Sequence, residues 1–332
     1  MFRSSPRLAL LFSPFPLLFA PPAHPQQPAP STPNIRVSVD RVDVGVVVTD
    51  SKGQFVGGLQ REAFHLLDDS VEQPISDFLS VDEPAQVLVL IEAGPAVYLI
   101  EGSHLQALNA LLNGLSPGDR VAIARYNEAP EPILNFTADK LAAAATLGQL
   151  RFNIGFGQLN LASSLTTALD WLADVPGKKS LVLLSTGFDT SPPAATQNLL
   201  TRLQSTDVRV LAISLGGELR GPAAPDKKRS KKDQPTPEKT RVAAEGFAQA
   251  DAELNSIAAA NGGRVYFPGS TKDFAEVFTE IAQLVRHEYS LGFVPPVRDG
   301  KQHAIEVRVN VSDPQSAASY RVDHRQAYIA PK

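Results

Sequence analysis

The chain has 332 residues, of which 43% are hydrophobic and 20% are charged, and its formal net charge is −4 at pH 7. This composition is typical of a globular protein with one large or two modest domains, and the mild charge argues against a surface that binds nucleic acid throughout. There is no cysteine, which excludes a disulfide framework, a thiol nucleophile and a cysteine-based zinc site.

The first 23 residues have the order of a secretory signal. Arg3 and Arg7 precede an apolar stretch at residues 8–19, and small residues follow at Ala20 and Ala23. We therefore expect a signal peptide at 1–23 and export to the periplasm or the medium. Prolines inside the apolar stretch keep an uncleaved anchor open as an alternative, and no other segment has the roughly 18–20 apolar residues of a membrane span. Residues 24–34, rich in Pro, Ala and Gln, predict a flexible tether.

Residues 35–83 predict β structure. Valines alternate with other residues at 42, 44, 46 and 48, which indicates strands with one buried side. Residues 64–67 and 74–81 flank a turn at residues 68–70 and predict a hairpin. A segment this small rarely has enough core to fold alone.

Residues 84–288 alternate between strand and helix patterns. Strands are predicted at 86–92, 120–126, 133–136, 180–184, 208–215 and 264–267, and helices near 103–115, 161–172, 194–204, before 261 and after 270. We expect Ser103, Asn160 and Ser270 to cap three of these helices. The alternation predicts an α/β fold with a doubly wound, mainly parallel sheet. Such sheets bind ligands at the carboxyl ends of their strands, and the central strand ends at Glu92.

A basic tract interrupts this pattern inside a segment, 217–243, that we expect to be a disordered loop. Its cations are Lys227, Lys228, Arg229, Lys231 and Lys232. The tract is either a solvated loop or a site for an anionic polymer or an envelope surface. No aromatic residue is interleaved to stack on bases, so specific nucleic-acid binding is not expected.

Residues 289–332 return to strand patterns. Ile305, Val307 and Val309 alternate with charged residues, and one further strand is predicted near 320–328. Because β segments flank the α/β part on both sides, we expect 35–83 and 289–332 to pair into one small β domain.

With these elements placed, residues 86–287 resemble a von Willebrand factor type A domain, and the mature chain resembles the secreted type A-related family described from acidobacteria. The matching segments are 46–59, 64–75 with Asp68 and Asp69, 115–121 (Leu-Ser-Pro-Gly-Asp-Arg-Val), 261–263 (Asn-Gly-Gly) and 289–293 (Tyr-Ser-Leu-Gly-Phe). The resemblance implies a type A, Rossmann-like fold and a role in protein binding.

The family's metal-ion-dependent adhesion site holds Mg²⁺ or Mn²⁺ with Asp-x-Ser-x-Ser, a Thr and a later Asp. The residues at the matching positions here are Glu92, Gly94, Ala96, Leu159 and Thr186. Three of them have no side-chain oxygen, so we expect a degenerate site without a metal or other cofactor. Ser185 and Asp189 lie nearby in sequence, and their oxygens leave weak Mg²⁺ binding open as an alternative.

The function expected from these observations is that of an exported, non-enzymatic module of adhesion or scaffold type. It would bind a protein partner at the carboxyl edge of the sheet without a metal, with Glu92 either receiving a partner's Lys or Arg or remaining a solvated loop carboxylate. The alternatives are a hydrolase that combines Asp189 with a histidine brought in by folding, although no hydrolase motif is present, and a polyanion binder that uses the basic tract. The partner's identity and the oligomeric state stay open.

Overall fold

The computed structural model describes residues 41–94, 101–148, 150, 157–219, 237–310 and 320–332. All of these fall within one compact unit, Val39–Lys332. The expected signal peptide, the tether, Ala96 and the basic tract lie outside the described residues. Among the described helices, none combines the length and the hydropathy that crossing a bilayer requires.

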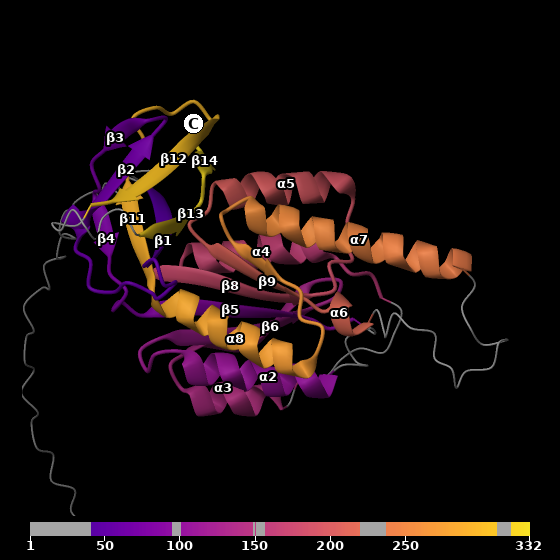
Figure 1. Ribbon diagram of the computed structural model, residues 1–332. Helices are drawn as coiled ribbons and strands as arrows, with labels where there is room; N and C mark the ends of the chain where they lie inside the picture. Colours follow the sequence, from indigo (N-terminus) through magenta and orange to yellow (C-terminus); the bar gives the residue numbers. More distant parts are fainter. Residues whose placement is uncertain (1–40, 95–100, 149, 151–156, 220–236, 311–319) are drawn as a thin grey trace, which may run out of the picture. The chain divides into compact units, whose positions relative to one another are not determined.

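A six-stranded sheet forms the centre of the α/β domain (Figure 1). Its order is β10-β9-β8-β5-β6-β7; every neighbouring pair is parallel except β6 and β7, which are antiparallel. Counted along the domain, this is the 3-2-1-4-5-6 order of a doubly wound fold, so the predicted fold class is confirmed. The strands are β5 (Ala85–Glu92), β6 (Arg120–Tyr126), β7 (Pro130–Thr137), β8 (Lys178–Ser185), β9 (Arg209–Ser214) and β10 (Arg264–Tyr266).

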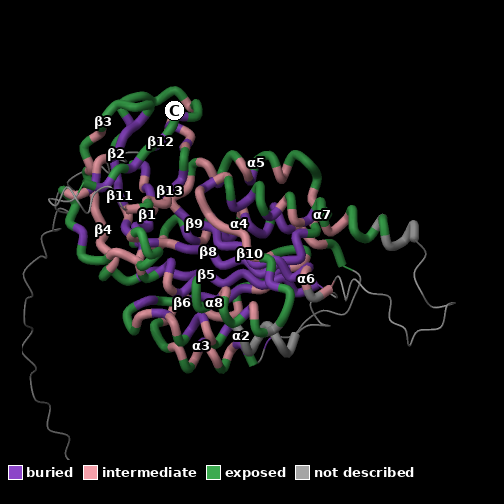
Figure 2. Tube along the Cα trace, in the orientation of Figure 1, coloured by how far each residue is buried: buried purple, intermediate pink, exposed green. Residues whose placement is uncertain are grey.

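Helices cover both faces of this sheet because successive residues of its central strands are apolar and point to opposite faces. In β5, Val87, Val89 and Ile91 pack with α2, α3 and α8, whereas Leu88 and Leu90 pack with α4, α5 and α7. Figure 2 shows the strands as a buried layer between the two sets of helices. The helices are α2 (Glu101–Gly114), α3 (Lys140–Leu147), α4 (Leu161–Ala173), α5 (Pro193–Gln204), the short α6 (Gly216–Leu219), α7 (Pro237–Ala259) and α8 (Thr271–Arg286).

Strands from both ends of the chain form a second body, the β lobe. One of its sheets has the order β13-β1-β11-β4 and the other β14-β12-β2-β3. β1 lies between β11 and β13, and β2 between β12 and β3, which confirms that the two chain ends pair. The strands are β1 (Val42–Thr49), β2 (Phe64–Asp68), β3 (Val71–Gln73), β4 (Asp77–Leu79), β11 (Glu288–Phe293), β12 (Gln302–Val309), β13 (Arg321–His324) and β14 (Ala327–Ile329), with the 3-10 turn η1 (Arg61–Ala63) before β2.

Two predictions about the β segments are wrong. The hairpin partner of β2 is β3, which follows a turn with positive φ at Asp69 (45°) and Ser70 (70°), while β4 joins the other sheet beside β11. The single strand expected at 320–328 is two strands in two sheets. They are separated at Arg325, whose buried guanidinium donates to the carbonyls of Thr206 and Asp43.

Two helix boundaries also differ from the predictions. α2 begins at Glu101, so Ser103 lies inside the helix and not at its cap. The segment expected to be a loop at 217–243 contains the end of α6 and the first residues of α7. The Ser270 cap is confirmed, since its hydroxyl accepts from Asp273 N at 3.3 Å.

The β lobe packs on the amino-terminal edge of the central sheet. Lys178, the first residue of β8, donates to the carbonyls of Ser80, Val81 and Glu288 at 3.1–3.2 Å. Arg209, the first residue of β9, lies 3.3 Å from the Glu288 carboxylate, and both side chains are buried. The β lobe therefore sits at the end of the domain opposite to the strands' carboxyl ends.

Candidate functional site

The carboxyl edge of the sheet is built around the switch point between β5 and β8. The connection after β5 crosses one face of the sheet through α2, and the connection after β8 crosses the other through α5. Diverging connections leave a crevice at this point, which is where doubly wound domains bind ligands. Glu92, Tyr126 and Ser185 end the three adjacent strands β5, β6 and β8.

These strand ends form a closed hydrogen-bond network around Glu92. One carboxylate oxygen of Glu92 accepts from Thr186 N at 2.7 Å and from Ser185 Oγ at 3.0 Å. The Thr186 hydroxyl lies within 3.0 Å of both oxygens. The single proton of Tyr126 OH is shared between Ser185 Oγ at 2.7 Å and the same Glu92 oxygen at 3.3 Å. Burial raises the pKa of the Glu92 carboxyl, although its hydrogen bonds act in the opposite direction, and burial raises the pKa of Tyr126 well above its usual value.

The expectation that Glu92 is an accessible carboxylate is wrong, because its exposed fraction is 0%. Gly94 lies between Glu92 and Leu159. A Cβ atom placed on Gly94 would lie 3.0 Å from Leu159 Cδ2 and 3.3 Å from Glu92 Oε1. Glu92 therefore cannot meet a partner's side chain without opening this edge.

The folded chain brings Glu92, Gly94, Leu159 and Thr186 together, as the matched adhesion-site positions require, while Ala96 is not described. These residues do not fit a Mg²⁺ ion. Gly94 and Leu159 offer no side-chain oxygen, and both oxygens of Glu92 already accept hydrogen bonds. Mg²⁺ needs oxygen ligands in near-octahedral array.

Asp189 caps the N-terminus of α4 at this edge. Its two oxygens accept from Leu161 N and Ala162 N, each at 3.1 Å, so it caps α4 from a distance of 28 residues in sequence. Asn160, the predicted cap, makes no side-chain cap bond and donates to Glu128 O instead. The described histidine side chains lie in the β lobe (His65, His303, His324) or stack on its Phe55 (His287), so none of them reaches Asp189.

Beside the Glu92 network lies a cleft of about 420 Å³, which we call the edge cleft. The β8–α5 loop forms one wall and α7 the other; the approach is so close that a Cβ on Gly187 would lie 2.4 Å from Ala250 O. Phe188 is 38% exposed at its mouth and packs against Phe247 with ring centroids 5.4 Å apart.

Two carboxylates, Asp189 and Glu253, line the edge cleft. Glu253 Oε1 is buried and has no hydrogen-bond partner among the described residues. Burial, followed by repulsion from Asp189, raises the pKa of Glu253. The sequence alone does not single out Glu253. The helical spacing of positions 246, 249, 250 and 253 indicates a common face, but nothing in the sequence says that the face meets the β8–α5 loop.

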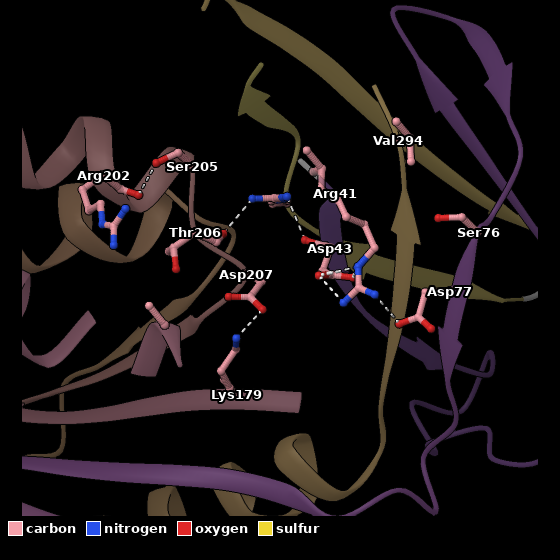
Figure 3. Close-up of a pocket in the computed structure, with 13 residues that line it drawn as sticks. Arg41, Asp43, Ser76, Asp77, Lys179, Arg202, Ser205, Thr206, Asp207 and Val294 are labelled. Atoms are coloured by element: carbon pink, nitrogen blue, oxygen red, sulfur yellow. Dashed lines mark hydrogen bonds and ion pairs between the residues drawn. The ribbon is translucent and has the colours of Figure 1, made fainter. Parts of the chain in front are cut away.

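A second cleft, of about 660 Å³, lies at the opposite edge between the β lobe and the end of α5 (Figure 3). Its carboxylates are paired: Arg41 lies 2.9 Å from Asp43 and 3.1 Å from Asp77, and Lys179 lies 2.7 Å from Asp207. Of its other cations, Arg325 donates to backbone carbonyls and Arg202 pairs with Asp170. We therefore interpret this cleft as part of the joint between the β lobe and the α/β domain.

No protein-family model matches the sequence, and no curated protein matches it. Among solved structures, a von Willebrand factor type A protein from Catenulispora acidiphila is 13% identical, with 90% of this chain and 76% of that chain covered and a TM-score of 0.47. BatB, a conserved hypothetical protein from Bacteroides thetaiotaomicron, is 12% identical, with 61% and 99% covered and a TM-score of 0.44.

Proximal thread matrix protein 1 from the mussel byssus, solved with a zinc-occupied adhesion motif, is 13% identical, with 62% of this chain and 48% of that chain covered and a TM-score of 0.42. Likenesses this distant carry no functional argument. The strand order defines the class by itself: a doubly wound α/β domain, of the kind expected from the type A resemblance, joined to a β lobe made from both chain ends.

Proposed function

We propose that this protein is a non-catalytic binding module that recognises a protein partner at the carboxyl edge of its central sheet, without a metal ion. The recognition surface is the edge cleft together with the loops after β5, before α4 and after β8. The observation that carries the proposal is the Glu253 carboxylate oxygen, which has no hydrogen-bond partner in the described part of the chain and lies in a preformed cleft beside the exposed ring of Phe188.

The chemistry of the edge cleft favours a basic side chain from the partner. A lysine or arginine would donate to Glu253 and lie near Asp189. The negative charges of Glu253 and Asp189 repel each other, and the cation would offset that repulsion. Phe188 and Phe247 would cover the apolar stem of that side chain. We therefore still propose that the partner contributes a lysine or arginine, but the residue that accepts its hydrogen bond is Glu253 and not Glu92.

The hydrogen bonds around Glu92 support the proposal that the partner binds without a metal ion. In the family's intact sites an ion offers an open coordination position to the partner. In this chain the positions of the family's hydroxyls are Gly94, Ala96 and Leu159, and the Glu92 carboxylate accepts hydrogen bonds from the Ser185 and Thr186 hydroxyls instead. The contacts of Asp189 support a non-catalytic role, because both of its oxygens accept backbone hydrogen bonds at the start of α4 and no described histidine side chain reaches it.

A photo-crosslinking amino acid placed at Phe188 tests this proposal. In the organism's own envelope fraction, we expect a discrete protein adduct whose yield is unchanged by EDTA. Glu253→Gln in the same chain should reduce the yield about tenfold, since hydrogen bonds to charged groups contribute roughly 1.5–3 kcal/mol. A panel of generic hydrolase substrates should show no turnover that depends on Asp189.

The matched control carries the crosslinker at Leu141, which is 83% exposed on α3 near the amino-terminal edge of the same domain. Equal adducts from both positions would show non-specific contact. An adduct that disappears with EDTA would mean that an ion takes part in recognition, contrary to the proposal.

A further inference from the structure

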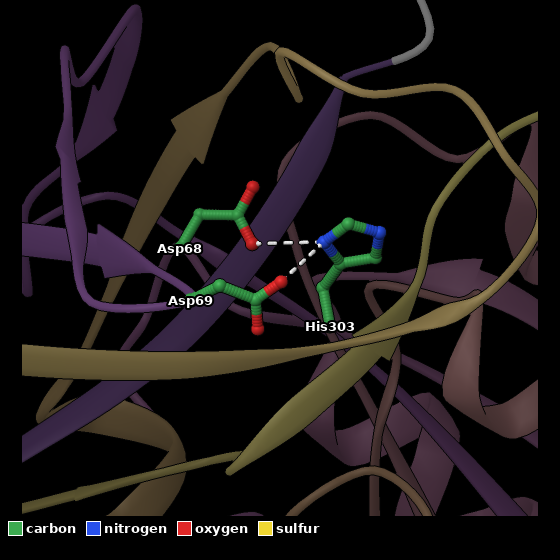
Figure 4. Close-up of side chains that lie close together, drawn as sticks. All are labelled: Asp68, Asp69 and His303. Carbon is green, nitrogen blue, oxygen red and sulfur yellow. Dashed lines mark ion pairs between the residues drawn. The ribbon is translucent and has the colours of Figure 1, made fainter.

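Three side chains with metal-binding atoms meet in the β lobe, far from the carboxyl edge (Figure 4). Asp68 ends β2, Asp69 begins the turn to β3, and His303 lies near the start of β12. β2 and β12 are adjacent antiparallel strands with Asp68 opposite Ile305. This pairing brings together residues that are about 235 positions apart in the chain.

Each of the three side chains is oriented by a hydrogen bond at one of its two polar atoms. Tyr328 OH donates to Asp68 Oδ2 at 3.1 Å, and Ala304 N donates to Asp69 Oδ1 at 2.8 Å. His303 Nε2 lies 3.2 Å from Asp299 Oδ1. A carboxylate that holds the far nitrogen of an imidazole is the usual outer support of a metal-bound histidine.

The remaining polar atoms point toward one another. His303 Nδ1 lies 2.8 Å from Asp69 Oδ2 and 3.5 Å from Asp68 Oδ1, and the three ligand atoms lie within 4.8 Å of one another. Asp68 is only 3% exposed, and its Oδ1 has no hydrogen-bond partner among the described residues. A buried carboxylate oxygen without a donor is costly unless a cation compensates it.

We propose that Asp68, Asp69 and His303 bind a first-row divalent transition-metal ion, with Zn²⁺ as the representative. Ligand atoms around a tetrahedral zinc at 2.0–2.2 Å lie about 3.3 Å apart, and the 2.8 and 3.5 Å separations bracket that value. A site with one imidazole and two carboxylates suits Zn²⁺ or Mn²⁺ better than Ca²⁺ or Mg²⁺, because Ca²⁺ and Mg²⁺ prefer oxygen ligands only. The exposed side of Asp69 leaves a fourth position open to water.

The ion would join the N-terminal and C-terminal halves of the β lobe. It would link the β2–β3 turn to β12 at a point where Tyr328 of β14 also contributes. Because the unfolded chain does not keep these ligands together, the binding energy would stabilise the folded lobe. This role is independent of the binding function proposed for the carboxyl edge.

Zinc titration of the full chain, prepared without a histidine tag and freed of metal with EDTA, tests the site. We expect one Zn²⁺ per molecule, a rise in Tm, and a visible Co²⁺ spectrum typical of four-coordination. Asp69→Asn and His303→Gln should abolish all three signals. Asn tolerates the φ of +45° at position 69, so the first variant should keep the fold. Asp299→Asn should weaken binding about 10–100-fold.

The matched control is His65→Gln. His65 also lies in β2 and contacts a carboxylate, Glu72, at 2.6 Å, but it is outside the cluster, so its variant should bind zinc as the native protein does. The proposal is overturned if the native chain does not bind zinc, which would mean that His303 holds only a proton between the carboxylates. It is also overturned if Asp69→Asn binds zinc with native affinity.

Discussion

Replacing Glu92 by Ala is expected to lower the free energy of unfolding by about 3–5 kcal/mol. The change removes the acceptor for the Thr186 amide and for the hydroxyls of Thr186 and Ser185, whereas Tyr126 OH keeps Ser185 Oγ as its acceptor at 2.7 Å. These donors are buried, and each buried group left without a partner costs about 1–3 kcal/mol. The change also leaves a cavity that the strand ends cannot easily fill.

Urea denaturation measures this loss. The matched control is Glu131→Ala, which removes an exposed carboxylate paired with Arg125 at 2.7 Å and should cost at most about 1 kcal/mol. Similar losses in the two variants would show that the Glu92 network does not stabilise the fold.

The stability contribution of Glu92 should depend on pH in a predictable direction. Because burial raises the pKa of Glu92 above its ordinary value of 4.5, the folded state binds this proton more tightly than the unfolded state. The free energy of unfolding should therefore fall as pH rises from near 4.5 through the raised pKa. Glu92→Gln should lack this component, so the difference between native and variant curves isolates it. A difference that grows in favour of the native protein as pH rises would contradict the assignment.

Deleting residues 41–81 is expected to abolish the cooperative unfolding of the β lobe and to promote aggregation. The deletion removes β1 from between β11 and β13, β4 from the other side of β11, and both β2 and β3 from the side of β12. The exposed edges and the apolar side chains of Tyr289, Leu291 and Phe293 would then lack their packing partners. Lys178 would also lose the carbonyls of Ser80 and Val81.

Fluorescence of Trp171, the only tryptophan, reports on the α/β domain, since its ring packs edge-on against Phe136 at 5.8 Å. We expect its unfolding midpoint to fall in the truncated chain. Val71→Ser, a change at a 62% exposed position of the edge strand β3, should leave the midpoint nearly unchanged. A truncated chain with the native midpoint would show that the α/β domain does not depend on the β lobe.

Local periodicity was enough to predict most elements of this fold. The apolar run of β5, the stripe of α8 and the Ser270 cap depend on residues within a few positions of one another. The end of α7 before Gly262 is also a local signal, because the φ of +72° at this residue is a conformation that glycine adopts without strain. The pairing of both chain ends could also be inferred, since neither β segment had enough core alone.

What the sequence by itself determined is therefore the α/β class, the presence of a β lobe and the position of Glu92 at the end of the central strand. Only the tertiary structure decided what the polar side chains do. Glu92 is buried because the ends of β5, β6 and β8 lie side by side, and Asp189 caps a helix that precedes it by 28 residues. Asp68, Asp69 and His303 meet only through the pairing of β2 with β12. These contacts join residues that are far apart in the chain. Helical and strand periodicity relates only residues within a few positions of one another, so it cannot predict such contacts.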